Sequence, residues 1–117
     1  MYYFPRQERL KGRDEIRGVF NGKRAVACQG AKLFLLKNRL SFNRIAFTFP
    51  RKFGNAVERN RARRLCREAY RHLRQNIRTG HDLVLLIYKS DNDGFHFRAS
   101  QLKELLCRAG LFNRTEQ

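Results

Sequence analysis

A chain of 117 residues is long enough to bury the core of one domain and too short for two. Hydrophobic residues make up 42% of the sequence, close to a globular average, but 26 Lys and Arg against 10 Asp and Glu give a net charge of +16. So large a charge repels itself in a folded chain, and it therefore indicates a polyanionic partner, nucleic acid first and an anionic membrane second.

Two features argue against a membrane-bound or secreted protein. The longest apolar run, residues 83–88, is far shorter than a membrane span, and residues 1–8 contain no hydrophobic signal segment, so we expect a cytoplasmic protein with no membrane partner. The cysteines, Cys28, Cys66 and Cys107, are odd in number and widely spaced, and no His lies at zinc-ligand spacing. We expect them to be small buried side chains.

The N-terminal half predicts one helix and two strands. Residues 13–20 are expected to be helical, because apolar side chains recur at i, i+3 and i+4 and acidic residues occupy the first turn. Residues 32–37 and 43–49 are expected to be strands, the second with large and small side chains in alternation. A turn over residues 38–41 would join these two strands as a hairpin.

The C-terminal half begins with a predicted long helix from Ala56 to about Ile77. Its apolar residues form one stripe at helical spacing, consisting of Ala62, Leu65, Cys66, Ala69, Leu73 and Ile77. Residues 83–88 predict a strand buried on both faces, and a turn over residues 91–94 leads to a last amphipathic helix. The order α-β-β-α-β-α predicts a single α+β domain over residues 1–117 with a small central sheet.

Half of the net charge lies in residues 51–78. This segment carries ten basic residues and two acidic ones, and nine of the ten are Arg. On the predicted helix, one group of side chains lies opposite the apolar stripe: Asn60, Arg63, Arg64, Arg67, Arg71 and Arg74. A solvated face usually mixes signs, whereas like charges at i and i+4 weaken a free helix. Because a guanidinium can clasp a phosphate and stack on a base, this face predicts nucleic-acid binding.

No common DNA- or RNA-reading motif accompanies the basic face. The sequence has no heptad seam and no second helix beside the long one, as a DNA-reading helix pair would need, and no GXXG loop or zinc knuckle. Ten Phe residues occur, among them Phe20, Phe34, Phe47 and Phe49. Core packing explains most of them, but rings on an open sheet face beside a basic patch also suit stacking on unpaired bases.

Two segments resemble a known family. Residues 52–70, KFGNAVERNRARRLCREAY, match without gaps the signature of bacterial ribonuclease P protein subunits, K-x-G-N-A-V-x-R-N-R-x-[KR]-R-x-x-R-[EQ]-x-[FY]. Residues 9–20, RLKGRDEIRGVF, resemble the opening helix of the same family. The resemblance implies a fold similar to domain 2 of ribosomal protein S5. In that fold the strand 43–49, the helix 56–77 and the strand 83–88 would form a left-handed β-α-β crossover, against the usual right-handed rule.

The same resemblance implies the function of a non-catalytic subunit of the ribonucleoprotein enzyme ribonuclease P. The partners would be ribonuclease P RNA, in a 1:1 complex, and precursor tRNA, whose 5′ leader is removed. The RNA would hold the catalytic Mg²⁺, so no catalytic residue, metal ligand or cofactor is expected in the protein. The expected contacts to the catalytic RNA are Arg51, Lys52, Asn55, Arg59, Asn60, Arg61, Arg63, Arg64, Arg67 and Arg71.

A leader-binding cleft is implied between the first helix and the sheet, with Arg13, Ile16, Phe20 and Phe34 as its residues. The family usually has Phe where this chain has Ile16, and an aliphatic side chain cannot stack on a base as a ring does. Phe20 keeps the ring.

The residues alone leave two other functions open. A structural RNA-binding protein of the ribosomal type would be equally basic. A protein-only nuclease would need converging carboxylates for a metal ion, but only Asp91 and Asp93 lie close together, and a turn explains them. His81 and Asp82, at the start of a strand, are expected to be exposed to solvent.

Overall fold

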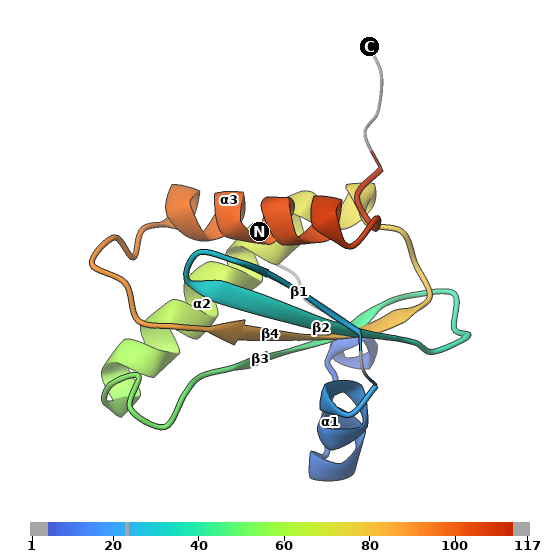
Figure 1. Ribbon diagram of the computed structural model, residues 1–117, viewed down its shortest axis with the longest axis horizontal. Helices are drawn as coiled ribbons and strands as arrows, with labels where there is room; N and C mark the ends of the chain where they lie inside the picture. The colour runs from blue at the N-terminus through green and yellow to red at the C-terminus, as the bar shows by residue number, and fades with distance from the viewer. Residues whose placement is uncertain (1–4, 23, 114–117) are drawn as a thin grey trace.

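The computed structural model describes residues 5–22 and 24–113 (Figure 1). With η marking a 3₁₀ helix, the elements are η1 (Arg6–Glu8), α1 (Arg13–Phe20), β1 (Ala25–Cys28), β2 (Ala31–Lys37), β3 (Arg44–Thr48), α2 (Ala56–Leu73), η2 (Arg74–Asn76), β4 (His81–Ile87) and α3 (Phe95–Arg108). The α+β class is confirmed, but the predicted order lacked β1. This strand is only four residues long and consists mainly of small side chains, so it has little hydrophobic signal.

The four strands form a mixed sheet in the order β1-β2-β4-β3. β1 and β2 are antiparallel, β2 and β4 are antiparallel, and β3 runs parallel to β4. The predicted hairpin between residues 32–37 and 43–49 is therefore wrong, because β4 lies between these two strands. The hairpin partner of β2 is β1, and the tight turn between them contains Gly30 at a φ of +87°, a conformation that favours glycine.

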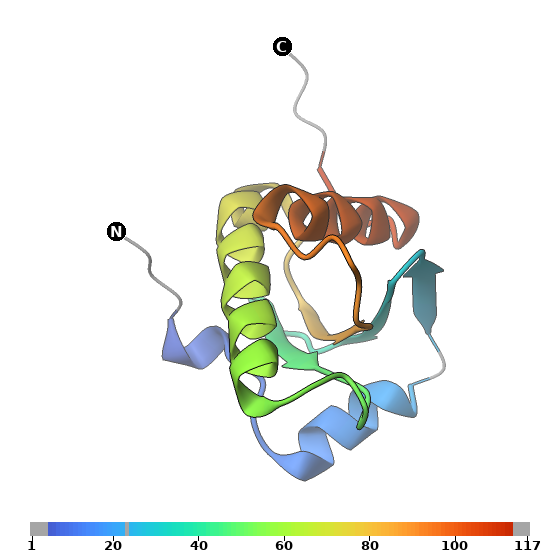
Figure 2. The ribbon, with the colours of Figure 1, turned by 90° about the vertical axis from the view of Figure 1, so that its left-hand side faces the viewer.

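Strand β3, helix α2 and strand β4 form a parallel β-α-β unit. α2 and α3 cover one face of the sheet, while α1 lies on the other (Figure 1). Followed through Figures 1 and 2, the connection from β3 through α2 to β4 is left-handed, as the resemblance implies. The consequence for the site is that α2 lies beside β3, the strand at the edge of the sheet.

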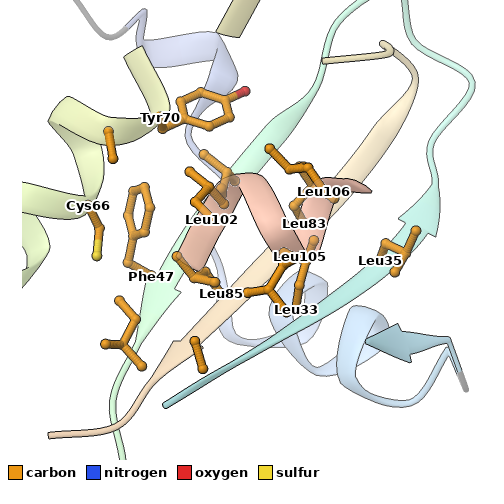
Figure 3. Close-up of a cluster of buried hydrophobic side chains, with 14 of the residues drawn as sticks. Leu33, Leu35, Phe47, Cys66, Tyr70, Leu83, Leu85, Leu102, Leu105 and Leu106 are labelled. Carbon is orange, nitrogen blue, oxygen red and sulfur yellow. The ribbon is translucent and has the colours of Figure 1, made fainter. Parts of the chain in front are cut away.

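The main core lies between the sheet and the pair α2 and α3 (Figure 3). The strands contribute Leu33, Leu35, Phe47, Leu83 and Leu85, and the helices contribute Cys66, Tyr70, Leu102, Leu105 and Leu106. The next residue on the central strand, Val84, belongs to a second cluster under α1. β4 is thus buried on both faces, as its apolar run predicts.

Both long helices differ in extent from the prediction. α2 ends at Leu73 instead of about Ile77, because Ile77 is extended and buried, and forms a β-bridge with Phe112. α3 begins at Phe95, well before the first Leu of the predicted stripe. Its early turns bury the polar side chains of Arg98 and Gln101, which interrupt the apolar pattern that sequence analysis follows.

The three cysteines occupy different environments, and the prediction that all are buried is wrong for two of them. Cys66 is 2% exposed, and burial raises the pKa of its thiol to about 12. Cys28 and Cys107 are half-buried.

We therefore expect an alkylating reagent at mildly alkaline pH to modify Cys28 and Cys107 in the folded chain and to spare Cys66, as measured by peptide mass spectrometry. Labelling of Cys66 at the same rate in folded and denatured protein would contradict its place in the core.

Candidate nucleic-acid interface

The outward side of α2 and the loop before it carry most of the residues predicted to bind the catalytic RNA. We call this the arginine surface; it consists of Arg51, Lys52, Asn55, Arg59, Asn60, Arg61, Arg63, Arg64 and Arg67. Three of these side chains, Arg59, Arg63 and Arg67, are half-buried and the others are exposed. The buried residues, on the opposite side of the helix, are Ala62, Cys66, Ala69 and Tyr70.

The half-buried trio of Arg59, Arg63 and Arg67 repeats once per turn of α2, so its charges lie close together. Burial lowers the pKa of Arg63, and repulsion from Arg67 and Arg59 lowers it further. Among the described residues, none of the three forms an ion pair with a carboxylate. The buried Nε atoms of Arg59 and Arg67 have no hydrogen-bond partner in this part of the chain. An anionic ligand would supply the opposite charge that these guanidiniums lack.

Neutral groups hold these arginines in place without cancelling their charge. The guanidinium of Arg59 donates to the carbonyl oxygen of Arg51 at 2.7 Å, and that of Arg63 donates to Oδ1 of Asn60 at 3.2 Å. The Arg63 guanidinium also lies 5.0 Å from the centroid of the Phe49 ring. The surface is therefore partly ordered before any ligand binds, which lowers the entropic cost of binding.

Toward the C-terminal end of α2 the cations are paired. The guanidinium of Arg71 donates to Oε2 of Glu68 at 2.7 Å, a contact that lowers the pKa of Glu68, and Arg74 forms an ion pair with Glu8. The basic face predicted from helical spacing therefore divides into a part with no ion pair to the described residues and a part whose cations are paired. Glu8 lies 66 residues from Arg74 in the sequence, so no local pattern could have predicted that pair.

Asn55, also expected to contact the catalytic RNA, caps α2. Its side-chain oxygen accepts from the backbone N–H of Glu58 at 2.8 Å, and the Glu58 carboxylate accepts from the backbone N–H of Asn55 at 3.0 Å. Lys89 donates to the same carboxylate at 2.8 Å, and these contacts together lower the pKa of Glu58. The signature asparagine thus fixes where the helix that carries the arginine surface begins.

Three of the four predicted leader-binding residues meet on the other face of the sheet. Ile16 and Phe20 from α1 and Phe34 from β2 are half-buried and pack around a buried cluster of Leu10, Val19, Ala46 and Val84. The ring centroids of Phe20 and Phe34 are 4.6 Å apart, and the rings meet edge to face. The fourth residue, Arg13, is exposed in the first turn of α1. Apolar and aromatic groups of α1 and β2 therefore meet on this face of the sheet.

Beside this cluster the sheet presents a row of residues that sequence analysis missed. Lys32, Leu86 and Thr48 are register partners across β2, β4 and β3, and all three are half-buried. They share a face with Phe34, Val84 and Ala46, since residues two apart on a strand point the same way. The Nζ atom of Lys32 lies 5.1 Å from the centroid of the Phe34 ring. Only the strand order, which the sequence does not reveal, brings this row together.

A groove connects the sheet face with the arginine surface. One cavity of about 250 Å³ lies between the N-terminal segment, α1, β3 and α2; a second of about 510 Å³ adjoins the loop before α2. Arg63 and Phe47 line both cavities, Ile16 lines the first, and Arg59 lines the second. We call the two cavities together the groove. The two sites predicted separately from the sequence are therefore continuous.

A partly buried ion pair connects α1 to the sheet beside the groove. Arg44 on β3 donates to both carboxylate oxygens of Asp82 on β4, at 2.8 and 2.6 Å, and to Glu15 of α1 at 3.2 Å. Asp82 also accepts from the side-chain amide of Asn38 at 2.8 Å. The hydrogen bond to Asp82 raises the pKa of Arg44. Asp82 is only 6% exposed, so the expectation that it faces solvent is wrong.

Over residues 5–22 and 24–113, no three side chains of His, Cys, Asp or Glu gather in a way that could hold a metal ion. Within the same ranges, no helix combines the length and the apolar character needed to cross a bilayer.

Comparison with known proteins places these features in a family. The family model described as Ribonuclease P matches residues 4–110. The chain belongs to the ribonuclease P protein family. The ribonuclease P protein component of Natranaerobius thermophilus is 40% identical to it over 108 residues, covering 92% of this chain and 87% of the relative.

Solved structures of ribonuclease P proteins show the same fold. The protein from Thermotoga maritima is 27% identical, with a TM-score of 0.78 over 86% of this chain and 96% of its own. The protein from Staphylococcus aureus is 22% identical, with a TM-score of 0.80 over 91% and 98%. The resemblance carried by residues 52–70 and 9–20 is confirmed, while the roles of individual residues in this ribonuclease P protein stay predictions.

Proposed function

We propose that this chain is the non-catalytic protein subunit of ribonuclease P. It binds ribonuclease P RNA, in a 1:1 complex, through the arginine surface, and it binds the 5′ leader of precursor tRNA through the groove and the neighbouring sheet face. The observation that carries this proposal is the groove itself, in which Arg63 and Phe47 belong to both cavities. One domain can therefore hold the catalytic RNA and its substrate next to each other.

The chemistry of the site suits binding better than catalysis. Most of its charged groups are guanidiniums, which remain protonated and cannot act as general bases. Hydrolysis and the Mg²⁺ ions that it requires are assigned to the RNA. The trio of Arg59, Arg63 and Arg67 would screen the phosphates of two RNAs that otherwise repel each other, and it would release their counterions. The protein should accordingly reduce the Mg²⁺ concentration that cleavage requires.

Selection of precursor over mature tRNA follows from contact with the leader. Phe20 and Phe34 offer partly open ring surface for stacking with unpaired bases. Lys32, beside the Phe34 ring, and the exposed Arg13 at the start of α1 are the cations that would pair with leader phosphates. Mature tRNA has no leader and gains none of these contacts. Binding energy from the sheet face is therefore available to the precursor alone.

The replacement Phe20→Ala tests this selection. Loss of one base–aromatic stack should weaken binding of precursor tRNA to the assembled enzyme by about five- to 150-fold, corresponding to about 1–3 kcal/mol. Affinity for mature tRNA should not change. Both affinities can be measured by titration with fluorescently labelled tRNAs.

The matched control is Phe112→Ala, since Phe112 is also half-buried but packs against the main core. Circular dichroism should show that both variants are folded. Equal losses of affinity for precursor and mature tRNA in Phe20→Ala would contradict the proposal that Phe20 contacts the leader.

A further inference from the structure

A cavity of about 580 Å³ lies at the C-terminal end of α2 and shares no lining residue with the groove. It is bordered by the end of α2, η2, the N-terminal segment and the loop that leads into β3. Its volume falls within the range of cavities that hold small organic ligands. None of the residues predicted from the sequence as leader contacts lines it, and Arg71 is the only predicted contact to the catalytic RNA that does.

The floor of the cavity is rigid. Tyr70 and Ile77 are 1% and 3% exposed. The side-chain amide of Asn43 donates to the carbonyl oxygen of Arg78 at 2.9 Å, while its oxygen accepts from the backbone N–H of His81 at 2.8 Å. The ion pair between Glu8 and Arg74 closes one side. Because these groups are already fixed, a ligand would pay little for ordering the site.

The rim offers three kinds of group at once. Phe42 contributes a half-buried ring, and Arg71 contributes a guanidinium that also donates to the carboxylate of Glu68. Ser41, Gln75 and Thr79 contribute exposed neutral groups that can donate and accept hydrogen bonds. These groups match the parts of a nucleotide: a flat ring can stack on the base, a cation can pair with the phosphate, and neutral groups can form hydrogen bonds with the polar edges of the base.

Other ligand classes fit this lining less well. A divalent cation needs several oxygen ligands, whereas the one carboxylate in the lining belongs to Glu8 and is paired with Arg74. A purely apolar ligand would desolvate the guanidinium of Arg71 and the neutral rim groups without replacing their water.

The cavity also lies next to the groove. Arg9 lines the groove and Glu8, the preceding residue, lines the cavity. On α2, Arg67 of the groove is one turn from Arg71 of the cavity. Figure 2 shows the N-terminal segment passing beside α2. An RNA strand bound in the groove could therefore extend along α2 to the cavity.

We propose that this cavity binds one unpaired ribonucleotide, with its base on Phe42 and its phosphate at Arg71. The inference rests on the proposed function, because the nucleotide belongs either to the leader or to the catalytic RNA. The contact would lengthen the stretch of single-stranded RNA that the protein holds beyond the leader-binding face.

Tryptophan fluorescence tests the contact directly. The natural sequence contains no Trp, so Phe42→Trp places a single reporter at the rim. In the reconstituted complex its emission should be quenched by a stacked base. Quenching when ribonuclease P RNA binds assigns the nucleotide to that RNA, and quenching only after addition of precursor tRNA assigns it to the leader. Leu40→Trp, at an exposed residue of the same loop that does not line the cavity, should not be quenched.

Two further variants test the same contact without the Trp substitution, in case Phe42→Trp does not fold. Phe42→Leu keeps the apolar volume but loses the ring, and it should weaken RNA binding by about five- to 150-fold, whereas Phe42→Tyr should bind normally. Unquenched emission from Phe42→Trp together with normal binding by Phe42→Leu overturns the inference. If that result is obtained, a Phe20→Trp variant tests the proposed function separately. Quenching of its emission by precursor tRNA would support the proposed function, and unquenched emission would contradict the proposed function as well as the inference about the cavity.

Discussion

Replacing Arg63 and Arg67 together by Gln should weaken binding to ribonuclease P RNA by two orders of magnitude or more. Hydrogen bonds to charged groups contribute about 1.5–3 kcal/mol each, and the structure shows no carboxylate among the described residues that already uses these two guanidiniums. The dependence of log K on log salt should flatten by about 1.5 units, because two fewer phosphates are neutralised. A titration at several salt concentrations measures both quantities.

The same variant should fold at least as stably as the natural chain. Arg63 and Arg67 lie one turn apart on α2, and burial together with repulsion from Arg67 lowers the pKa of Arg63, so their replacement removes an unfavourable contact. The matched control is Lys37→Gln with Lys103→Gln, which removes the same charge from two exposed residues outside the groove. Equal losses of affinity in the two double variants would show that the arginine surface acts only through the net charge.

Replacing Asp82 by Ala should lower the free energy of unfolding by about 3 kcal/mol, because among the described residues it leaves the partly buried guanidinium of Arg44 with Glu15 as its one carboxylate partner. Glu15→Gln should cost less than about 1 kcal/mol, since its carboxylate is half exposed. Urea denaturation of the two variants gives the comparison.

This pair also positions α1, so Asp82→Ala should weaken precursor binding more than it weakens binding to the catalytic RNA. The double variant Arg44→Met with Asp82→Leu should recover part of the lost stability, because an apolar pair leaves no buried charge unpaired. An unfolding free energy of Asp82→Ala within about 0.5 kcal/mol of the natural chain would contradict the role assigned to the ion pair.

Local sequence patterns predicted the helices better than the sheet. The range 13–20 is confirmed for α1, where periodicity and N-terminal acids agree. The basic and apolar sides of α2 also follow from helical spacing, although Tyr70 was missed as a core residue. The hairpin prediction was wrong because strand pairing is nonlocal: the alternation within 43–49 shows that a strand exists and says nothing about its neighbour.

The candidate site divides in the same way. Residues of one helix, such as Arg63 and Arg67, could be grouped from their spacing. The row that contains Lys32 depends on the order of three strands, and the groove depends on where the N-terminal segment crosses α2. Contacts of this kind require the three-dimensional fold.

The most direct test of the whole account is reconstitution of precursor tRNA cleavage at a Mg²⁺ concentration too low for ribonuclease P RNA to act efficiently alone. Addition of this chain should restore removal of the 5′ leader, and the chain with Mg²⁺ but without the RNA should cleave nothing. Failure to stimulate the RNA would favour a structural RNA-binding role. Cleavage by the RNA-free protein, abolished by Asp91→Ala, would show that the protein itself carries the catalytic site.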